Sequence, residues 1–322
     1  MKDELDVLVV GPTYLDHVIV VEKFGLDTSS RIAEEHLVPG GTGFSYARNL
    51  ALLGYRVGLC SILGTCAQSA SLREEMGRYG IIDLCDSVIG EVDRAYVVVD
   101  KTGNKFAASC RKISGFLFAK GSLFEESMAR ASSVVVTSVS SQCAQRIFGG
   151  FRKSRRSAPG AKSIFFAPNR HLATHPGVWD CIIRDRAADV AVLSRSEWEA
   201  IPLKVRDDVR RSINSIVVTE GKDGYWLYSR DGECGYPPFP GAVQCVVSPN
   251  GAGEAFGSGL WAGMWFGLSF EDAGRLGALY AYQALEQPHC IPPKINAAEL
   301  LIMLRRVVSL DYRNTNDVWV DE

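Results

Sequence analysis

A glycine turn in the C-terminal half of the chain has residue types and spacing suited to binding an anion. Residues 246–247 are apolar, residues 248–254 read Ser-Pro-Asn-Gly-Ala-Gly-Glu, and a helix is expected to follow. A strand that runs into a glycine turn and then a helix directs backbone N–H groups and the positive helix end at one point. Glu254 would then stand beside a bound phosphate. The alternative interpretation is an ordinary helix start whose acid favours the helix dipole.

A second glycine cluster, Pro39-Gly40-Gly41-Thr42-Gly43, lies between a predicted strand and a helix expected at 44–53. Glycines let the backbone approach a ligand closely, although a plain turn explains the cluster equally well. No Gly-x-x-x-x-Gly-Lys-Ser/Thr motif is present, which excludes a P-loop nucleotide site. The turn at 251 also lacks the spacing, and the parallel strand after its helix, that a dinucleotide-binding motif needs.

The elements that must position these turns alternate between short apolar strands and longer helices. Parallel strands covered on both faces read as continuous apolar runs, so the pattern predicts a parallel sheet with helices on both sides. The expected strands are 5–10, 57–62, 95–100, 133–137, 163–167, 190–194, 216–219 and 243–247. Expected helices include 44–53, 123–130, 144–153, 251–267, 269–286 and 297–308.

Two regions depart from this rhythm. Residues 17–24 and 31–38 alternate apolar and polar side chains, as half-exposed strands do, and a hairpin turn is expected at 101–104 between two further strands. These pieces either form a small separate sheet that serves as a lid or add edge strands to the main sheet.

The composition restricts the partners of this chain. It has 322 residues, with 35 Lys and Arg against 37 Asp and Glu, and this near-neutral balance argues against nucleic acid as a partner. No apolar run approaches the roughly 18 residues that span a membrane. The acidic N-terminus does not resemble a signal peptide, and the nine cysteines include no Cys-x-x-Cys pair. We therefore expect a cytoplasmic protein with reduced thiols.

A series of motifs in the correct order resembles those of the PfkB (ribokinase-like) family of carbohydrate and nucleoside kinases, over roughly residues 5 to 290. The glycine cluster from Gly40 through Leu53-Gly54 is similar to the first family signature, and Asn250 to Phe256 is similar to the second. The intervening and flanking matches are Gly11 with Asp16, Asp93 to Lys105, Ala167-Pro168-Asn169, Ser194-Arg195-Ser196-Glu197 and Thr219-Glu220-Gly221-Lys222-Asp223-Gly224.

The resemblance implies an α/β fold, a ribokinase-like three-layer sandwich whose mostly parallel central sheet is flanked by helices and accompanied by a small β-sheet lid. It implies one domain over residues 1–322, with lid strands at approximately 12–39 and 95–112. In such kinases the lid strands often pair two subunits, so a homodimer through the lid is an expectation.

The resemblance also implies the activity and its residues: ATP-dependent phosphoryl transfer to a small sugar or nucleoside. Asp16, Gly40, Gly41 and Ser45 would bind the acceptor, and Glu254 would be the general base beside an anion hole of Gly251, Ala252 and Gly253. Glu197 would order Mg²⁺ through water. The nucleotide would be bordered by Ser194, Thr219, Gly221, Gly224 and Asn250.

Five sites depart from the family pattern. Glu254 stands in place of the catalytic Asp, and Ser45 in place of the acceptor-binding Asn. Ala167 and Ser194 replace an Asp and an Asn, and Ser248-Pro249 replaces Asp-Thr, which puts the monovalent-cation site of some relatives in question. Two interpretations follow: a working kinase with an altered acceptor pocket, or a pseudokinase that binds nucleotide or sugar without turnover. A structural or partner-binding protein is a third.

Overall fold

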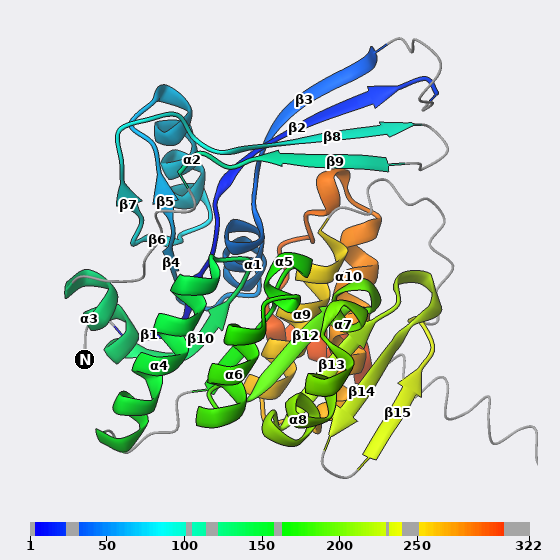
Figure 1. Ribbon diagram of the computed structural model, residues 1–322. Coiled ribbons are helices and arrows are strands. Elements are labelled where there is room, and N and C mark those ends of the chain that lie inside the picture. Colours follow the sequence, from blue (N-terminus) through cyan, green and yellow to red (C-terminus); the bar gives the residue numbers. More distant parts are fainter. Residues whose placement is uncertain are drawn as a thin grey trace, which may run out of the picture.

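The main sheet of the computed structural model has nine strands in the order β15-β14-β13-β12-β11-β10-β1-β4-β6 (Figure 1). The structure describes residues 4–23, 32–100, 105–113, 122–157, 163–229, 232–239 and 251–305. The strands are β1 (Leu5–Val10), β4 (Val57–Cys60), β6 (Ile82–Asp83), β10 (Ala131–Val136), β11 (Ser163–Phe166), β12 (Val190–Ser194), β13 (Ser215–Thr219), β14 (Tyr225–Ser229) and β15 (Gly232–Tyr236).

Seven of these strands run parallel, from β6 to β13, and the apolar runs of the six predicted ones are buried as the sequence pattern predicts, whereas the short β6 is not. Strand β1 sits between β4 and β10, with Val9 opposite Leu59 on one side and Val135 on the other. Strands β14 and β15 extend the sheet in antiparallel fashion and were not predicted. The strand expected at 57–62 is two strands, β4 and β5 (Ile62–Leu63), because β5 leaves the main sheet to pair with β7 (Asp86–Ser87). The strand expected at 243–247 lies outside the described residues.

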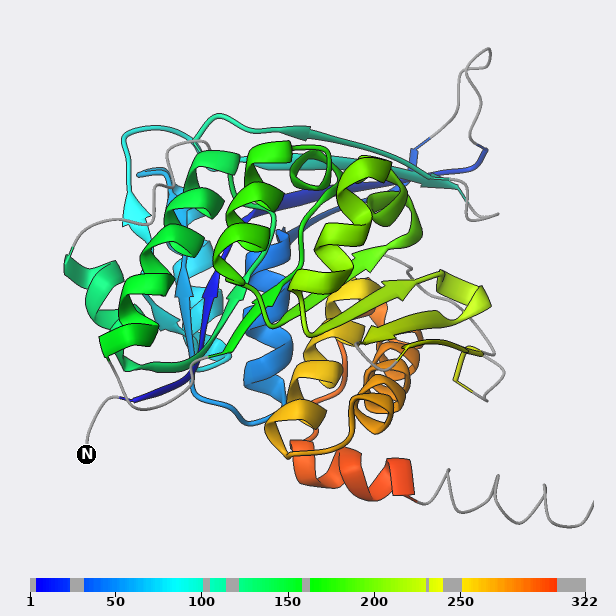
Figure 2. The ribbon, with the colours of Figure 1, turned by 60° about the horizontal axis from the view of Figure 1, so that its bottom comes forward.

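Helices cover both faces of the main sheet (Figures 1 and 2). One face packs against α1 (Thr42–Leu52), α2 (Ala67–Arg78), α9 (Ala252–Trp265) and α10 (Phe270–Leu285). The other packs against α3 (Ser122–Arg130), α4 (Ser141–Ser157), α5 (Arg170–Ala173), α6 (Pro176–Asp185), α7 (Arg195–Ala200) and α8 (Leu203–Ser212). Two 3₁₀ turns, η2 (Gly221–Asp223) and η3 (Pro288–Cys290), follow β13 and α10, and residues 297–305 are helical. The helices predicted over 251–267 and 269–286 are thus confirmed with slightly shorter bounds.

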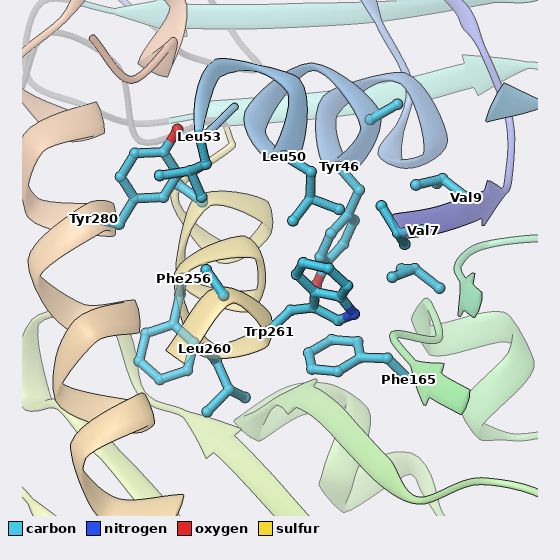
Figure 3. Close-up of a cluster of buried hydrophobic side chains, with 14 of the residues drawn as sticks. Val7, Val9, Tyr46, Leu50, Leu53, Phe165, Phe256, Leu260, Trp261 and Tyr280 are labelled. Atoms are coloured by element: carbon cyan, nitrogen blue, oxygen red, sulfur yellow. The ribbon is translucent and has the colours of Figure 1, made fainter. Parts of the chain in front are cut away.

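The core between the sheet and helices α1, α9 and α10 determines where the glycine turns lie (Figure 3). Trp261 of α9 packs edge-on against Tyr55 and donates its indole N–H to Ser133 Oγ of β10 at 2.9 Å. Helices α9 and α10 approach closely because Gly259 has no side chain. A Cβ on Gly259 would lie only 2.9 Å from the Cα of Gly277. This packing anchors α9 beneath the sheet and so determines the position of its N-terminus.

A separate four-stranded sheet projects above the main one (Figure 1). It consists of β2 (Tyr14–Val21), β3 (Ile32–Gly40), β8 (Arg94–Asp100) and β9 (Lys105–Cys110), in the order β3-β2-β8-β9. Strands β2 and β8 are parallel, whereas the two outer pairs are antiparallel. The prediction of a small separate sheet is confirmed, and the alternative of edge strands on the main sheet is wrong. The proposed turn at 101–104 lies outside the described residues.

The described residues include eight of the nine cysteines, and all eight are free thiols. No helix in the described part of the chain has the length and apolar character needed to cross a bilayer.

Candidate active site

The predicted site residues gather at the carboxyl edge of the parallel strands, where open α/β sheets bind ligands. Because β1, β10, β12 and β13 are parallel and in register, the residues that follow them lie along this one edge. Gly11 follows β1, Ser194 ends β12 and Thr219 ends β13 directly opposite Ser194. Distant motifs of the sequence thereby become neighbours.

A cavity of about 680 Å³ lies at this edge, between the inner face of the lid and the first turns of α1 and α9. Five predicted residues line it: Asp16, Gly41, Ser45, Gly251 and Glu254. Alternate residues of the lid strands form its apolar wall, namely Val18, Val20, Val38, Ala95, Val97, Val99 and Ala107. The lid therefore contributes one face of the cavity and presents its opposite face outward.

The start of α1 is built by close backbone approach. Gly41 has a φ of 97°, a conformation that glycine adopts without strain. Gly40 packs directly on the Asp16 carboxylate, so a side chain there would displace that group. Within the helix, a Cβ on Gly43 would lie only 2.5 Å from the backbone carbon of Gly11. The first glycine cluster thus allows β1, β2 and α1 to converge on one side of the cavity.

The start of α9 forms the other side. Gly251 precedes the helix with a φ of 107°, and within the described residues no side chain caps the helix. The first N–H groups of a helix lack intrahelical acceptors and carry the positive end of its dipole. A Cβ on Gly253 would meet nothing within 4 Å, so no described residue covers the helix start on the side that Gly253 faces. These features suit an anion, as the sequence predicted; Asn250 lies outside the described residues.

The charge of Glu254 acts on several buried groups around the cavity. Burial, followed by the charge of Glu254, raises the pKa of the Cys290 thiol to about 12. The same two causes raise the pKa of Tyr46, whose ring lies beneath α9. Burial also raises the pKa of Glu197, and Glu254 adds to that effect. Glu197 and Glu254 therefore lie close enough for their charges to interact, although they are far apart in the sequence.

The described residues that were predicted to border the nucleotide follow β12 and β13 along the same edge, outside the lining of this cavity: they are Ser194, Thr219, Gly221 and Gly224. Ser194 and Glu197 form a capping box on α7: Glu197 Oε2 accepts from the Ser194 backbone N–H at 2.7 Å, and Ser194 Oγ accepts from the Glu197 N–H at 3.3 Å. Gly221 and Gly224 both have positive φ in the turn after β13. Thr219 Oγ1 donates to the carbonyl of Leu193 at 3.4 Å.

Sequence reasoning missed a group of cavity residues that share no local motif. They are Tyr14, His36, Arg48, Tyr79 and His289. The rings of His36, on the lid, and His289, in η3, meet edge-on with centroids 5.6 Å apart. Only Arg48 had a local signal, since it follows Ser45 by three residues and so falls on the same face of α1. Among the described residues, no group of three or more His, Cys, Asp or Glu side chains could hold a metal ion.

Comparison with known proteins identifies the family of this chain. The chain belongs to the pfkB family of carbohydrate kinases, whose model matches residues 4–297. It is 24% identical to the pseudouridine kinase of Escherichia coli (strain K12), over 92% of this chain and 99% of that protein.

Solved structures show the same fold. A Burkholderia thailandensis nucleoside kinase in complex with inosine superposes with a TM-score of 0.77 and 17% identity, over 93% of this chain and 97% of that one. Arabidopsis thaliana ribokinase, complexed with ribose and ATP, gives a TM-score of 0.72 at 16% identity, over 94% of this chain and 99% of the other. The predicted ribokinase-like sandwich with a lid is thus confirmed.

Proposed function

We propose that this protein transfers a phosphoryl group from ATP to a hydroxyl of a small sugar or nucleoside, with Glu254 as the general base. The observation that carries the proposal is that one cavity contains Asp16, Gly41 and Glu254, with Glu254 one turn into the helix that opens at Gly251. The names of the relatives support the same acceptor class.

The residues of the chain would position the acceptor and the phosphoryl group, and one of them would accept a proton. Asp16, packed against Gly40, would accept hydrogen bonds from hydroxyls of the acceptor. Glu254 would take the proton of the attacking hydroxyl as the new O–P bond forms and the bond to the leaving ADP breaks. The backbone N–H groups at residues 251–253 would hold the anionic group in line.

The residues present fit ATP and Mg²⁺. When bound, ATP supplies the phosphoryl group and Mg²⁺ neutralises its charge. The described residues leave the helix start uncovered at Gly253, which suits an anion. Burial raises the pKa of Glu197 and the charge of Glu254 adds to that effect, and a dication would relieve the repulsion between the two acids. Because Glu197 Oε2 is engaged by the Ser194 N–H, we place Mg²⁺ beyond a water molecule, which suits an ion that keeps much of its hydration shell. Ser194, Thr219, Gly221, Gly224 and Asn250 would border the nucleotide.

Glu254 decides between a kinase and a pseudokinase. Glutamate and aspartate have similar pKa values, so either can act as base, but the extra methylene displaces the carboxylate by about 1 Å, which can cost about 10²-fold in rate. Ser45 leaves more room than the family's asparagine, so a repositioned acceptor can absorb that displacement.

The test is release of ADP with ATP, Mg²⁺ and a panel of sugars and nucleosides, for the parent, Glu254→Gln and Glu254→Asp. We expect the Gln variant to lose about 10²- to 10⁴-fold in kcat while it retains ATP binding by calorimetry. Unchanged turnover in the Gln variant would remove Glu254 as the base. Nucleotide binding without turnover by the parent would support the pseudokinase, and activity gained by the Asp variant would show that only the base is displaced. Absence of both nucleotide and sugar binding would leave a structural role.

The lid also supports a proposal about assembly. Its outward face exposes Leu37, Tyr96 and Phe106, which are 54%, 37% and 53% accessible. We propose that these side chains are covered in a homodimer formed through the lid. Sedimentation analysis of Leu37→Glu should then show a shift to monomer, whereas a parent that sediments as a monomer would refute the dimer.

A further inference from the structure

Arg48 is a buried cation in the wall of the proposed acceptor cavity. It lies on α1, three residues beyond Ser45, and only 4% of its surface is accessible. Its Nε has no hydrogen-bond partner, and within the described part of the chain no carboxylate forms an ion pair with its guanidinium. The ring of Phe44 lies beside the guanidinium, with its centroid 5.8 Å from the guanidinium carbon.

This arrangement is costly unless something supplies a counter-charge. Burial lowers the pKa of Arg48, but a guanidinium remains charged in proteins at every physiological pH. A buried charge without a partner destabilises the folded state, so such groups are normally paired or face a ligand. A cation–π contact with Phe44 offsets only a part of that cost.

Of the four acids that share the cavity with Arg48, Asp16 lies against Gly40 and is assigned to the acceptor hydroxyls, and Glu34 and Glu75 pair with other side chains. Glu75 pairs with Arg78 at 2.9 Å, and Glu34 pairs with His36 at 3.1 Å. The charge of Glu254 reaches Arg48, but the proposed reaction uses that carboxylate for the proton of the acceptor hydroxyl.

The neighbouring side chains add further nitrogen donors. His289 and His36 line the same cavity, and the pKa of His289 is lowered by burial and then by the charges of His36 and Arg48. A ligand that carries negative charge would reverse this effect on His289 and satisfy Arg48 at once.

We infer that Arg48 determines acceptor specificity by binding an anionic group, a carboxylate or a phosphate, so that the acceptor is an acidic sugar or a sugar phosphate. The inference rests on the proposed kinase function, because it assigns the substrate class of the same cavity. A guanidinium forms two parallel charge-assisted hydrogen bonds with either group, whereas the hydroxyls of a neutral sugar supply no counter-charge. Three residues along α1 separate Arg48 from Ser45 by about 4.5 Å, so the anionic group lies nearly one helical turn from the acceptor contacts at Ser45.

The experiment uses the full chain with a non-hydrolysable ATP analogue and Mg²⁺, and calorimetry with ligands matched in pairs. Glucuronate is compared with glucose, and ribose 5-phosphate with ribose, so that the first pair tests a carboxylate and the second a phosphate. The variant Arg48→Met removes the charge at similar length, and Arg211→Met, on the exposed side of α8, is the matched control. We expect the parent to bind one anionic member about 10- to 100-fold more tightly than its neutral twin, and Arg48→Met to lose that preference.

Two outcomes would overturn the inference: a parent that binds the neutral twins as well as the anionic compounds, or an Arg48→Met variant that keeps the preference. Circular dichroism checks that the Met variant folds. If it does not, Arg48→Lys is used, which keeps the charge but loses the two parallel N–H donors of the guanidinium. This variant should retain part of the preference. Turnover of neutral sugars alone would uphold the kinase and refute the role of Arg48, whereas anion binding without ADP release by the parent would uphold Arg48 and refute turnover.

Discussion

The two halves of the site are built in different ways. On the acceptor side, segments far apart in the chain meet backbone to backbone, as Gly43 of α1 does with Gly11 after β1, and a lid closes the cavity. On the donor side, the cap is local, because Ser194 caps its own helix with Glu197, and Arg195 adds an ion pair with Glu220 from the next strand end.

The difference explains which departures from the family pattern are structurally mild. Serine is as good an N-cap as asparagine, so Ser194 keeps the role that a local motif requires. Ser45 has no such local role and changes the shape of a cavity shared by several segments. We therefore expect acceptor-side substitutions to be costly through tertiary packing, and donor-side ones to be small and local.

The largest effect is expected at the backbone contact on the acceptor side. Gly43→Ala would force α1 away from Gly11 and should lower the free energy of unfolding by about 3 kcal/mol, as overpacking does. The control is Gly77→Ala on α2, where a Cβ meets nothing within 4 Å, and it should stabilise by about 0.5–1 kcal/mol. Urea unfolding of both variants measures the contrast, and equal effects would show that the close approach is unimportant.

A smaller loss is expected at the donor-side cap. Ser194→Ala removes the acceptor of the Glu197 N–H and should cost about 1 kcal/mol of unfolding free energy. Ser194→Asn should stay within a few tenths of a kcal/mol of the parent. If the alanine and asparagine variants unfold at the same urea concentration, the capping box does not stabilise this edge.

The half-buried acid of the same cap, Glu197, should make the stability of the protein depend on pH. The folded pKa of Glu197 is raised, mainly by burial, so the folded state binds more protons than the unfolded one above pH 4.5, and stability falls as pH rises through that window. Glu197→Gln retains a capping side chain without the charge, and its thermal unfolding should depend less on pH between 4.5 and 8. The exposed Glu199→Gln on the same helix is the control, and a matching change there would contradict the assignment.

The smallest effect is expected at His289, on the acceptor side. Its folded pKa is lowered, mainly by burial, so the unfolded state binds more protons below pH 6.5 and stability decreases as pH falls through that value. His289→Gln should flatten this part of the melting-temperature profile, while the exposed His171→Gln should not. A profile identical to that of the parent would mean that the pKa of His289 does not differ between the folded and unfolded states.

Local physical requirements predicted the glycine turns one by one, and the family resemblance assigned them to one site. The glycine turns before α1 and α9, and the acid after the second turn, were assigned to one site, and the structure brings Gly41 and Glu254 into one cavity with Asp16. Arg48, His36 and His289 were not assigned to it. Their proximity depends on how the lid, α1 and η3 pack together, and no spacing in the sequence expresses that.

By itself, the sequence determined the parallel sheet with helices on both faces, the two glycine turns and the order of the motifs, because apolar periodicity and backbone conformation are local properties. Only the tertiary structure decided that β5 leaves the main sheet, that the alternating strands form a separate lid, and that a buried arginine faces the cavity. Those outcomes depend on which apolar surfaces are buried against one another, and this is determined only when segments far apart in the sequence pack together.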